Sequence, residues 1–201
     1  MAERFDRDYF DRWYRDPRHR IGTAADLERT VRFAVAAAEY VLARPVRTVL
    51  DVGAGEGRWE PVLRRLRPRV SYVGVDPSEY VLRRFGARRN VVRGTADDLD
   101  ALFGERTFDL VVCFSVLNYL PHAAADRALA SIARHTGGIA CIEIYTSSDE
   151  VTGDTAGWHA RSPARTRAAL ARAGLMACGL GCYVFRTERG RLTAMERCAD
   201  A

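Results

Sequence analysis

The chain of 201 residues contains no lysine, so all 31 of its basic side chains are arginines. The net charge of +5 invites comparison with nucleic-acid-binding proteins. However, the use of arginine at every position where lysine could also stand indicates a bias in composition rather than selection for phosphate contacts. Arginines also gather at 64–67 and 83–89, where two predicted helices end and positive charge offsets the helix dipole. We therefore expect no nucleic-acid partner.

Long apolar runs and paired cysteines are missing as well. Because no run approaches the roughly 18 apolar residues of a membrane span, none is predicted. The opening residues MAERFDRDYF are charged and aromatic, unlike a signal peptide, which favours a cytoplasmic location. The five cysteines form no CxxC pair, and Cys113 and Cys141 lie in apolar runs where cysteine behaves as a small hydrophobe. Neither a metal site nor a disulfide framework is predicted.

Helical patterns occupy the first 44 residues. Residues 5–14 form one short amphipathic segment, and a longer helix begins at Thr23 or Asp26 and runs to about Leu42. Apolar residues three and four positions apart give the longer helix one buried face. We interpret residues 1–44 as an N-terminal helical attachment to a single domain whose main part is 45–201.

Strands and helices alternate after residue 45. The predicted strands are 47–52, 70–76, 90–94, 108–117, 138–145, 177–186 and 191–198. The predicted helices are 58–66, 78–86 (ending at a glycine), 97–103, 123–135 and 163–174. A turn at 188–190 joins the last two strands and is too short for a parallel crossover, so they form an antiparallel hairpin. The pattern predicts an α/β fold with a doubly wound, mostly parallel, seven-stranded sheet.

The most informative motif is 49-VLDVGAGEGRW-59, where a strand passes into a helix through three alternating glycines. A dinucleotide-binding loop reads G-x-G-x-x-G, and here the third glycine comes one residue early. Asp51 and Glu56 would repel a pyrophosphate and suit a cationic ligand. Asp76 ends the second strand, a position from which an acid typically binds ribose hydroxyls. We expect a nucleoside ligand without a phosphate.

This motif, Asp76, the stretch GTADDL (94–99) and FDLV (108–111) together resemble the class I S-adenosylmethionine-dependent methyltransferases over about residues 45–145. The resemblance implies a Rossmann-like methyltransferase fold. It also implies S-adenosyl-L-methionine as cofactor and S-adenosyl-L-homocysteine as product. The cofactor-binding residues that it implies are Asp51, Gly53, Ala54, Gly55, Asp76, Pro77, Ser78, Ala96, Asp97, Cys113 and Phe114.

Two of these assignments fall where the chain departs from the family. Relatives often carry an acid directly after the glycine of the 94–99 stretch, and this chain has Thr95 there. The backbone of Ala96 and the carboxylate of Asp97 are the substitutes that we assign to the adenine amino group. After the fourth strand, Cys113, Phe114 and Ser115 are expected near the sulfonium.

The acceptor side is predicted from two loops and the N-terminal helix. The loop 113–122 lacks the N/D-P-P-Y/F tetrapeptide of relatives that methylate base amines or glutamine amides, which disfavours those substrates. The loop 146–162 is long for a structureless connection, often a sign of function. Histidine and tyrosine can serve as bases, so the catalytic candidates are His122, His159 and Tyr145. The candidate substrate or lid residues are Tyr9, Trp13, Tyr14, Asn118, Tyr119, Trp158 and Arg161.

The resulting hypothesis is a methyltransferase that acts on an oxygen or nitrogen of a small-molecule acceptor. The alternatives are a cofactor-binding protein without transfer activity, another transferase on the same fold, and a nicotinamide-dependent oxidoreductase. The N-terminal aromatics either close the site as a lid or simply pack on the sheet. The sequence leaves the acceptor, the methylated atom and the oligomeric state open.

Overall fold

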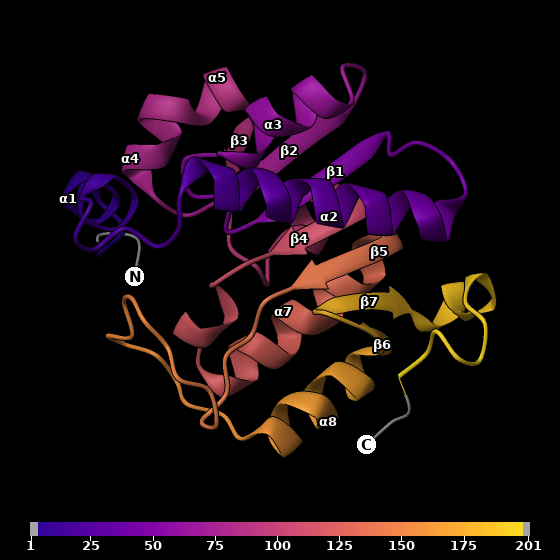
Figure 1. Ribbon diagram of the computed structural model, residues 1–201. Helices are drawn as coiled ribbons and strands as arrows, with labels where there is room; N and C mark the ends of the chain where they lie inside the picture. The colour runs from indigo at the N-terminus through magenta and orange to yellow at the C-terminus, as the bar shows by residue number, and fades with distance from the viewer. Residues whose placement is uncertain (1–3, 199–201) are drawn as a thin grey trace.

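The computed structural model describes residues 4–198 and confirms the predicted α/β architecture. Its seven strands form one sheet in the order β3-β2-β1-β4-β5-β7-β6 (Figure 1). The five parallel strands are β1 (Thr48–Val52), β2 (Ser71–Asp76), β3 (Val91–Arg93), β4 (Phe108–Cys113) and β5 (Thr136–Ile142). Strand β7 (Cys182–Phe185) is antiparallel to both β5 and β6 (Leu175–Gly179).

Helices cover both faces of the sheet and bury its apolar side chains. On one face lie α2 (Ala24–Leu42) and α3 (Trp59–Leu66), which share a core cluster with β1, β4 and β5. On the other lie α6 (Leu99–Phe103), α7 (His122–His135) and α8 (Pro163–Ala173). Because both faces are covered, strands β1 and β4 read as nearly continuous apolar runs, interrupted by Asp51 and Asp109, rather than as alternating ones.

The parallel register places four strand ends at one edge of the sheet. Asp51 of β1 is level with Val112 of β4, which is level with Cys141 of β5. Since parallel strands share a direction, the loops after β2, β1, β4 and β5 all emerge at this carboxyl edge. The functional candidates therefore come together there from separate stretches of sequence.

The helix predicted to end at Gly86 continues past it. The segment comprises α4 (Glu79–Val81), a π-helical turn over Leu82–Gly86 and α5 (Ala87–Arg89). Gly86 has the helical φ of −48°, whereas Asn90 takes the left-handed φ of +50° that ends the helix. Asparagine tolerates this conformation better than most residues, and its side chain bonds to the Tyr72 carbonyl.

The C-terminal hairpin is present, but its predicted boundaries are wrong. The strands are β6 and β7, and residues 186–191 form a 3₁₀ helix instead of the predicted turn and strand. The chain reverses at Gly179, Leu180 and Gly181, with φ of +90°, +53° and +74°. The glycines on both sides of Leu180 allow such a turn. They are a stronger signal for the hairpin turn than the Glu188–Gly190 segment that was predicted.

The hairpin also brings two cysteines together that lie far apart in sequence. Cys141 of β5 faces Cys182 of β7, and their Sγ atoms lie 3.6 Å apart. All five cysteines are free thiols, and Cys113 and Cys141 are buried in the sheet as predicted.

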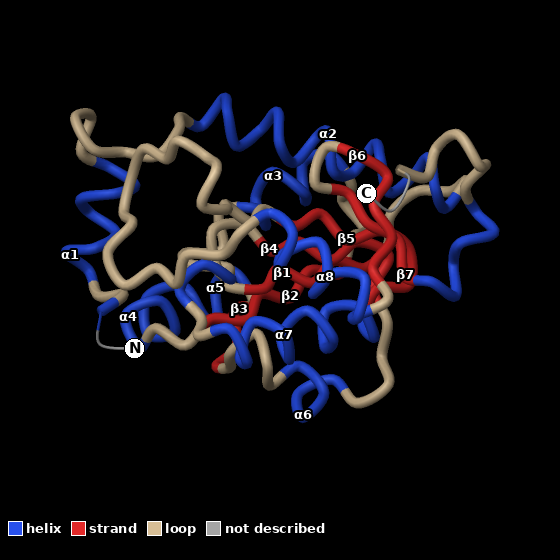
Figure 2. The backbone as a smooth tube through the Cα atoms, turned by 90° about the horizontal axis from the view of Figure 1, so that it is seen from below, coloured by secondary structure: helices blue, strands red, loops and turns tan. Residues whose placement is uncertain are grey.

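The N-terminal segment consists of α1 (Arg7–Phe10), a π-helical turn over Asp11–Arg15, and α2. Thr23 caps α2 and forms a capping box with Asp26, so both predicted cap residues act together. Within residues 4–198, no helix is both long and apolar enough to span a bilayer. Figure 2 shows α1 and the loops between strands and helices at one end of the molecule.

Candidate active site

The glycine loop after β1 has a backbone that other residues would strain. Gly53, Gly55 and Gly57 have φ of +72°, +51° and +65°. A Cβ atom on Gly53 would lie 2.1 Å from Cγ2 of Val116, so glycine is required on steric grounds too. The Gly53 and Ala54 amides both donate to the Val75 carbonyl, at 2.8 and 3.0 Å. The loop is thereby fixed to the end of β2.

Asp76 holds the same loop from the other side. Its carboxylate accepts the Gly55 amide at 2.8 Å and the Ser78 amide at 2.9 Å. The side chain is buried, and burial raises its pKa while the two amide bonds act in the opposite direction. Asp76 therefore lies against the glycine loop.

Asp51 is a buried carboxylate with few partners. Only the Tyr72 hydroxyl donates to it, at 2.8 Å, among the described side chains. Burial, assisted by the charge of Asp76 and opposed by the Tyr72 hydrogen bond, raises its pKa to about 7. A cation arriving beside Asp51 would stabilise its charged form, so this position suits a positively charged ligand group.

Glu56 has a different role from the one its sequence position suggests. Its carboxylate pairs with Arg15 at 2.5 Å and accepts the Tyr80 hydroxyl at 3.3 Å. Since Arg15 belongs to the N-terminal segment, the charge of Glu56 is balanced within the chain. The attraction for a cationic ligand thus depends on Asp51 rather than on two loop carboxylates.

The N-terminal segment lies directly on the glycine loop. A Cβ atom on Gly55 would lie 2.9 Å from the Tyr14 hydroxyl and 3.2 Å from Cε1 of Phe10. Phe10 is buried and stacks on Tyr80 at 5.6 Å between ring centroids. The Ser78 hydroxyl donates to the Phe5 carbonyl. Contacts at three places hold the segment over the proposed cofactor side.

Of the remaining cofactor candidates, some form hydrogen bonds or ion pairs with other side chains, and others pack in the hydrophobic core. Asp97 bonds to Thr95 and forms an ion pair with Arg127 at 2.9 Å, beside buried Ala96. Cys113 is fully buried in the core, and burial raises its pKa. Phe114 packs against Trp59, and Pro77 lies between Asp76 and Ser78.

An aromatic cluster links the N-terminal segment to the long loop 143–162. Tyr9 and Tyr119 approach within 3.4 Å through their hydroxyls, and Tyr119 donates to Asp154. Trp158 packs edge-on against Tyr119 and stacks on Tyr145. Figure 1 shows this loop close to α1. Of the lid candidates, Trp13 alone packs elsewhere, edge-on against His19.

Two candidate substrate residues bond to backbone. The Asn118 side chain donates to the Tyr145 carbonyl at 2.7 Å and accepts the Tyr145 amide at 3.1 Å. The buried guanidinium of Arg161 donates to the carbonyls of Leu117, Leu120 and His159. In this structure both side chains hold the loops after β4 and β5 together.

The catalytic candidates occupy two places. His122 and His159 are exposed, with ring centroids 6.4 Å apart, and nearby arginines lower the pKa of His122 together with desolvation. Tyr145 lies closer to the sheet, where burial and Glu143 raise its pKa to about 12. The structure thus pairs the two histidines with each other and Tyr145 with Glu143.

Glu143 is the acidic residue that sequence analysis missed. It directly follows β5, and its carboxylate accepts the Ser115 hydroxyl at 2.5 Å. Ser115 has φ of +57°, a strained conformation for a residue with a side chain. The signal was available, since Glu143 is an acid at the carboxyl end of a strand, like Asp51 and Asp76.

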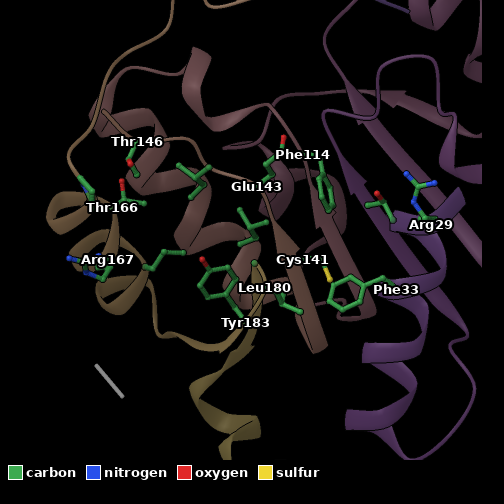
Figure 3. A pocket seen from close by; sticks show the side chains of 16 residues that line it. Arg29, Phe33, Phe114, Cys141, Glu143, Thr146, Thr166, Arg167, Leu180 and Tyr183 are labelled. Carbon is green, nitrogen blue, oxygen red and sulfur yellow. The ribbon is translucent and has the colours of Figure 1, made fainter. Parts of the chain in front are cut away.

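A pocket of about 670 Å³ opens next to Glu143. It lies between α2 and α8, beyond the end of β5, and the β6–β7 turn forms part of its wall (Figure 3). Glu143 and Phe114 lie side by side at one end of it (Figure 3). The volume is in the range of pockets that bind small molecules. Within residues 4–198, no three His, Cys, Asp or Glu side chains are arranged to hold a metal ion.

The sequence matches the family model described as "Methyltransferase domain" over residues 8–173. The match covers most of the chain and includes the N-terminal segment, the glycine loop and α8. The protein therefore belongs to this methyltransferase family, and its fold is that of the class I S-adenosylmethionine-dependent methyltransferases.

Individual relatives are more distant. Trans-aconitate 2-methyltransferase of Deinococcus radiodurans is 29% identical over 112 residues, which are 54% of this chain and 42% of that protein. Magnesium protoporphyrin IX methyltransferase of Synechocystis PCC 6803, with bound S-adenosylhomocysteine, has a TM-score of 0.62 at 16% identity, covering 88% and 89% of the two chains. A complex of the Haloferax volcanii Trm112 methyltransferase activator with a methyltransferase matches with a TM-score of 0.53 at 27% identity, covering 85% and 77%.

Proposed function

We propose that this protein transfers a methyl group from S-adenosylmethionine to an oxygen or nitrogen atom of a small-molecule acceptor. The observation that carries the proposal is the pair of buried carboxylates, Asp51 and Asp76, on either side of a glycine loop with positive φ. A buried carboxylate with a pKa of about 7 is an energetic cost that a bound cation relieves. The family match supports the same activity.

The residues of the carboxyl edge fit this cofactor. Asp51 would face its ammonium group, and Asp76 would accept hydrogen bonds from the ribose hydroxyls. The backbone of Gly53–Gly55 would adjoin the methionine part. Pro77, Ser78, Ala96 and Asp97 would surround the adenine, and Cys113 and Phe114 would border the sulfonium through the start of the loop after β4.

When bound, S-adenosylmethionine supplies a methyl group activated by a positively charged sulfur. The protein must align the acceptor and keep water away, because a charged reactant reacts faster in a dry, preorganised site. Phe10 and Tyr14 of the N-terminal segment lie over the loop and are placed to exclude water. Tyr9, Tyr119 and Trp158 extend this cover toward the acceptor side.

A small acceptor is supported by the size of the pocket and by the relatives. Trans-aconitate and magnesium protoporphyrin IX, named for two of these relatives, are both small molecules. The candidates that the sequence offers as a base for the acceptor are His122, His159 and Tyr145. Of these, Tyr145 is the one beside Glu143, which follows β5 and raises the pKa of Tyr145.

Calorimetric titration with S-adenosylmethionine, S-adenosylhomocysteine and NADH tests the cofactor. We expect the first two to bind with micromolar or better affinity and NADH not to bind. Binding of NADH without binding of S-adenosylmethionine would contradict the proposal. A second assay follows labelled methyl transfer into a metabolite extract, which separates a transferase from a protein that only binds the cofactor.

A further inference from the structure

We infer that the pocket between α2 and α8 holds the methyl acceptor with its nucleophilic atom at Glu143. We further infer that the acceptor is a largely apolar molecule carrying a hydroxyl or an amine rather than a carboxylate. This inference rests on the proposed function, which it deepens by naming a site and a substrate class. It starts from a carboxylate and a pocket that the cofactor assignment leaves unused.

The sheet places Glu143 on the correct side of the cofactor residues. Along the carboxyl edge the strand order is β2, β1, β4, β5, so Asp76, Asp51, Phe114 and Glu143 follow one another. Neighbouring strands are about 4.8 Å apart, which separates Asp51 from Glu143 by roughly 10 Å across the sheet. The residues assigned to the sulfonium thus lie between the ammonium position and Glu143.

Glu143 is held in place by its neighbours. The Ser115 hydroxyl donates to one of its oxygens, and the Glu143 amide donates to the Cys113 carbonyl at 2.9 Å. Within residues 4–198, the Ser115 hydroxyl donates to Oε1 of the carboxylate, and the Tyr145 hydroxyl lies near the same group. The carboxylate therefore retains lone pairs for a ligand.

The pocket walls are largely apolar. Phe33 comes from α2, Leu170 from α8, Ile144 from the loop after β5 and Tyr183 from β7. Phe114 lies beside Glu143 (Figure 3). Besides Glu143, the polar lining residues are Arg29 and Thr30 of α2, Thr166 and Arg167 of α8, and Thr146. The two arginines stand on opposite sides of the pocket, with Glu143 between them (Figure 3). A ring or other apolar body fits such walls, and a polar atom is favoured where Glu143 stands.

The chemistry of Glu143 selects the nucleophile. A hydroxyl or amine donates a hydrogen bond to the carboxylate, and this contact aims its lone pair. As the new bond from oxygen or nitrogen to the methyl carbon forms and the carbon–sulfur bond breaks, the acceptor's proton passes to Glu143. A carboxylate acceptor has no proton to donate, and its charge is repelled by Glu143. This acceptor class therefore differs from trans-aconitate, for which one relative is named.

A matched set of naphthyl probes tests the substrate class. Binding of 2-naphthol, 2-naphthylmethylamine and 2-naphthoate is measured by calorimetry on protein loaded with S-adenosylhomocysteine. We expect the alcohol or the amine to bind at least about tenfold more tightly than the carboxylate, equivalent to ~1.4 kcal/mol. Equal or tighter binding of 2-naphthoate would overturn the inference, and so would no binding of any probe to the loaded protein. Failure of S-adenosylhomocysteine to bind would instead contradict the proposed function.

Three variants, one of them a control, locate the effect. Glu143→Gln removes the charge but keeps the shape, so we expect the preference against 2-naphthoate to fall to about twofold or less. Glu150→Gln, an exposed acid on the following loop, is the matched control and should keep the preference. Phe33→Ala, on the exposed side of the pocket, should weaken the binding of all three probes without changing the affinity for S-adenosylhomocysteine. An unchanged preference in Glu143→Gln would show that Glu143 does not face the ligand.

Discussion

The two halves of the carboxyl edge are built differently. On the cofactor side, after β1 and β2, Asp51 and Asp76 are buried beside the glycine loop. Asp76 accepts two backbone amides, and Asp51 accepts the Tyr72 hydroxyl. On the acceptor side, after β4 and β5, the pocket draws its walls from α2, α8 and the C-terminal hairpin. The first half, which we propose to hold the cofactor, is built from neighbouring stretches of sequence, whereas the walls of the second come from segments far apart in the chain.

The largest effect is expected on the cofactor side. Asp51→Asn keeps a partner for the Tyr72 hydroxyl but removes the charge that faces the ligand's ammonium group. We expect the affinity for S-adenosylmethionine to fall by roughly 2–5 kcal/mol, the cost of losing one partner of a buried charge pair. Calorimetry measures it, with Asp126→Asn on α7 as a control that should bind like the wild type. Wild-type affinity in Asp51→Asn would remove the distinction between the two halves.

Asp76→Ala should have the next largest effect on cofactor affinity. The substitution frees the Gly55 and Ser78 amides and leaves ribose hydroxyls without an acceptor. We expect a loss of roughly 1–3 kcal/mol, the cost of unpaired buried polar groups. Binding of the naphthyl probes to the variant saturated with S-adenosylhomocysteine should change little. A larger effect on the probes than on the cofactor would contradict the division of the site.

The pKa of Asp51 predicts that the ligand-free protein loses stability as pH rises. Burial favours the protonated carboxyl in the folded protein. The stabilisation that results is complete below pH 3.8, the pKa of the carboxyl in the unfolded chain, and is lost as pH rises through about 7, its pKa in the folded protein. Denaturant unfolding at pH 5 and pH 8 should differ by an amount on the order of 2 kcal/mol. Asp51→Asn should reduce this difference, and saturating S-adenosylmethionine should do the same. Equal pH dependence in the variant would show that Asp51 is not the titrating group.

The smallest effect concerns the N-terminal cover. Arg15→Ala breaks the ion pair with Glu56 that connects the segment to the glycine loop. Because Arg15 is partly exposed, we expect a loss of at most about 1 kcal/mol, seen as dissociation of S-adenosylhomocysteine a few times faster in stopped-flow measurements. Arg12→Ala, whose guanidinium lies over Trp13, is the matched control and should leave the rate unchanged. Identical rates in both variants would argue that the segment does not gate the cofactor.

The cofactor side was predictable because its structure is encoded locally. Alternating glycines need positive φ wherever they occur, and an acid at a strand end has a fixed place in a parallel sheet. Asp76 accordingly lies against the glycine loop. Glu56 was misinterpreted as a ligand group because its partner, Arg15, comes from a segment that only the folded chain brings near.

The acceptor side was less predictable because distant segments create it. Glu143 lies in the apolar run IEIY, where its place at a strand end is the signal in the sequence, and its hydrogen bond from Ser115 is seen only in the fold. The hairpin boundaries were wrong, so the contribution of Leu180 and Gly181 to the pocket wall was not foreseen. Asn118 in the loop 113–122 and Arg161 in the loop 146–162 were predicted as substrate contacts, although their partners are backbone groups.

The most direct test of this account is a crystal structure of the protein with S-adenosylhomocysteine. The account predicts that the ligand lies along Gly53–Gly55, with its ribose hydroxyls at Asp76 and its ammonium group at Asp51. The pocket between α2 and α8 should remain open beside Glu143. A ligand found in that pocket, or one whose ribose lies away from Asp76, would contradict the assignment of the two halves.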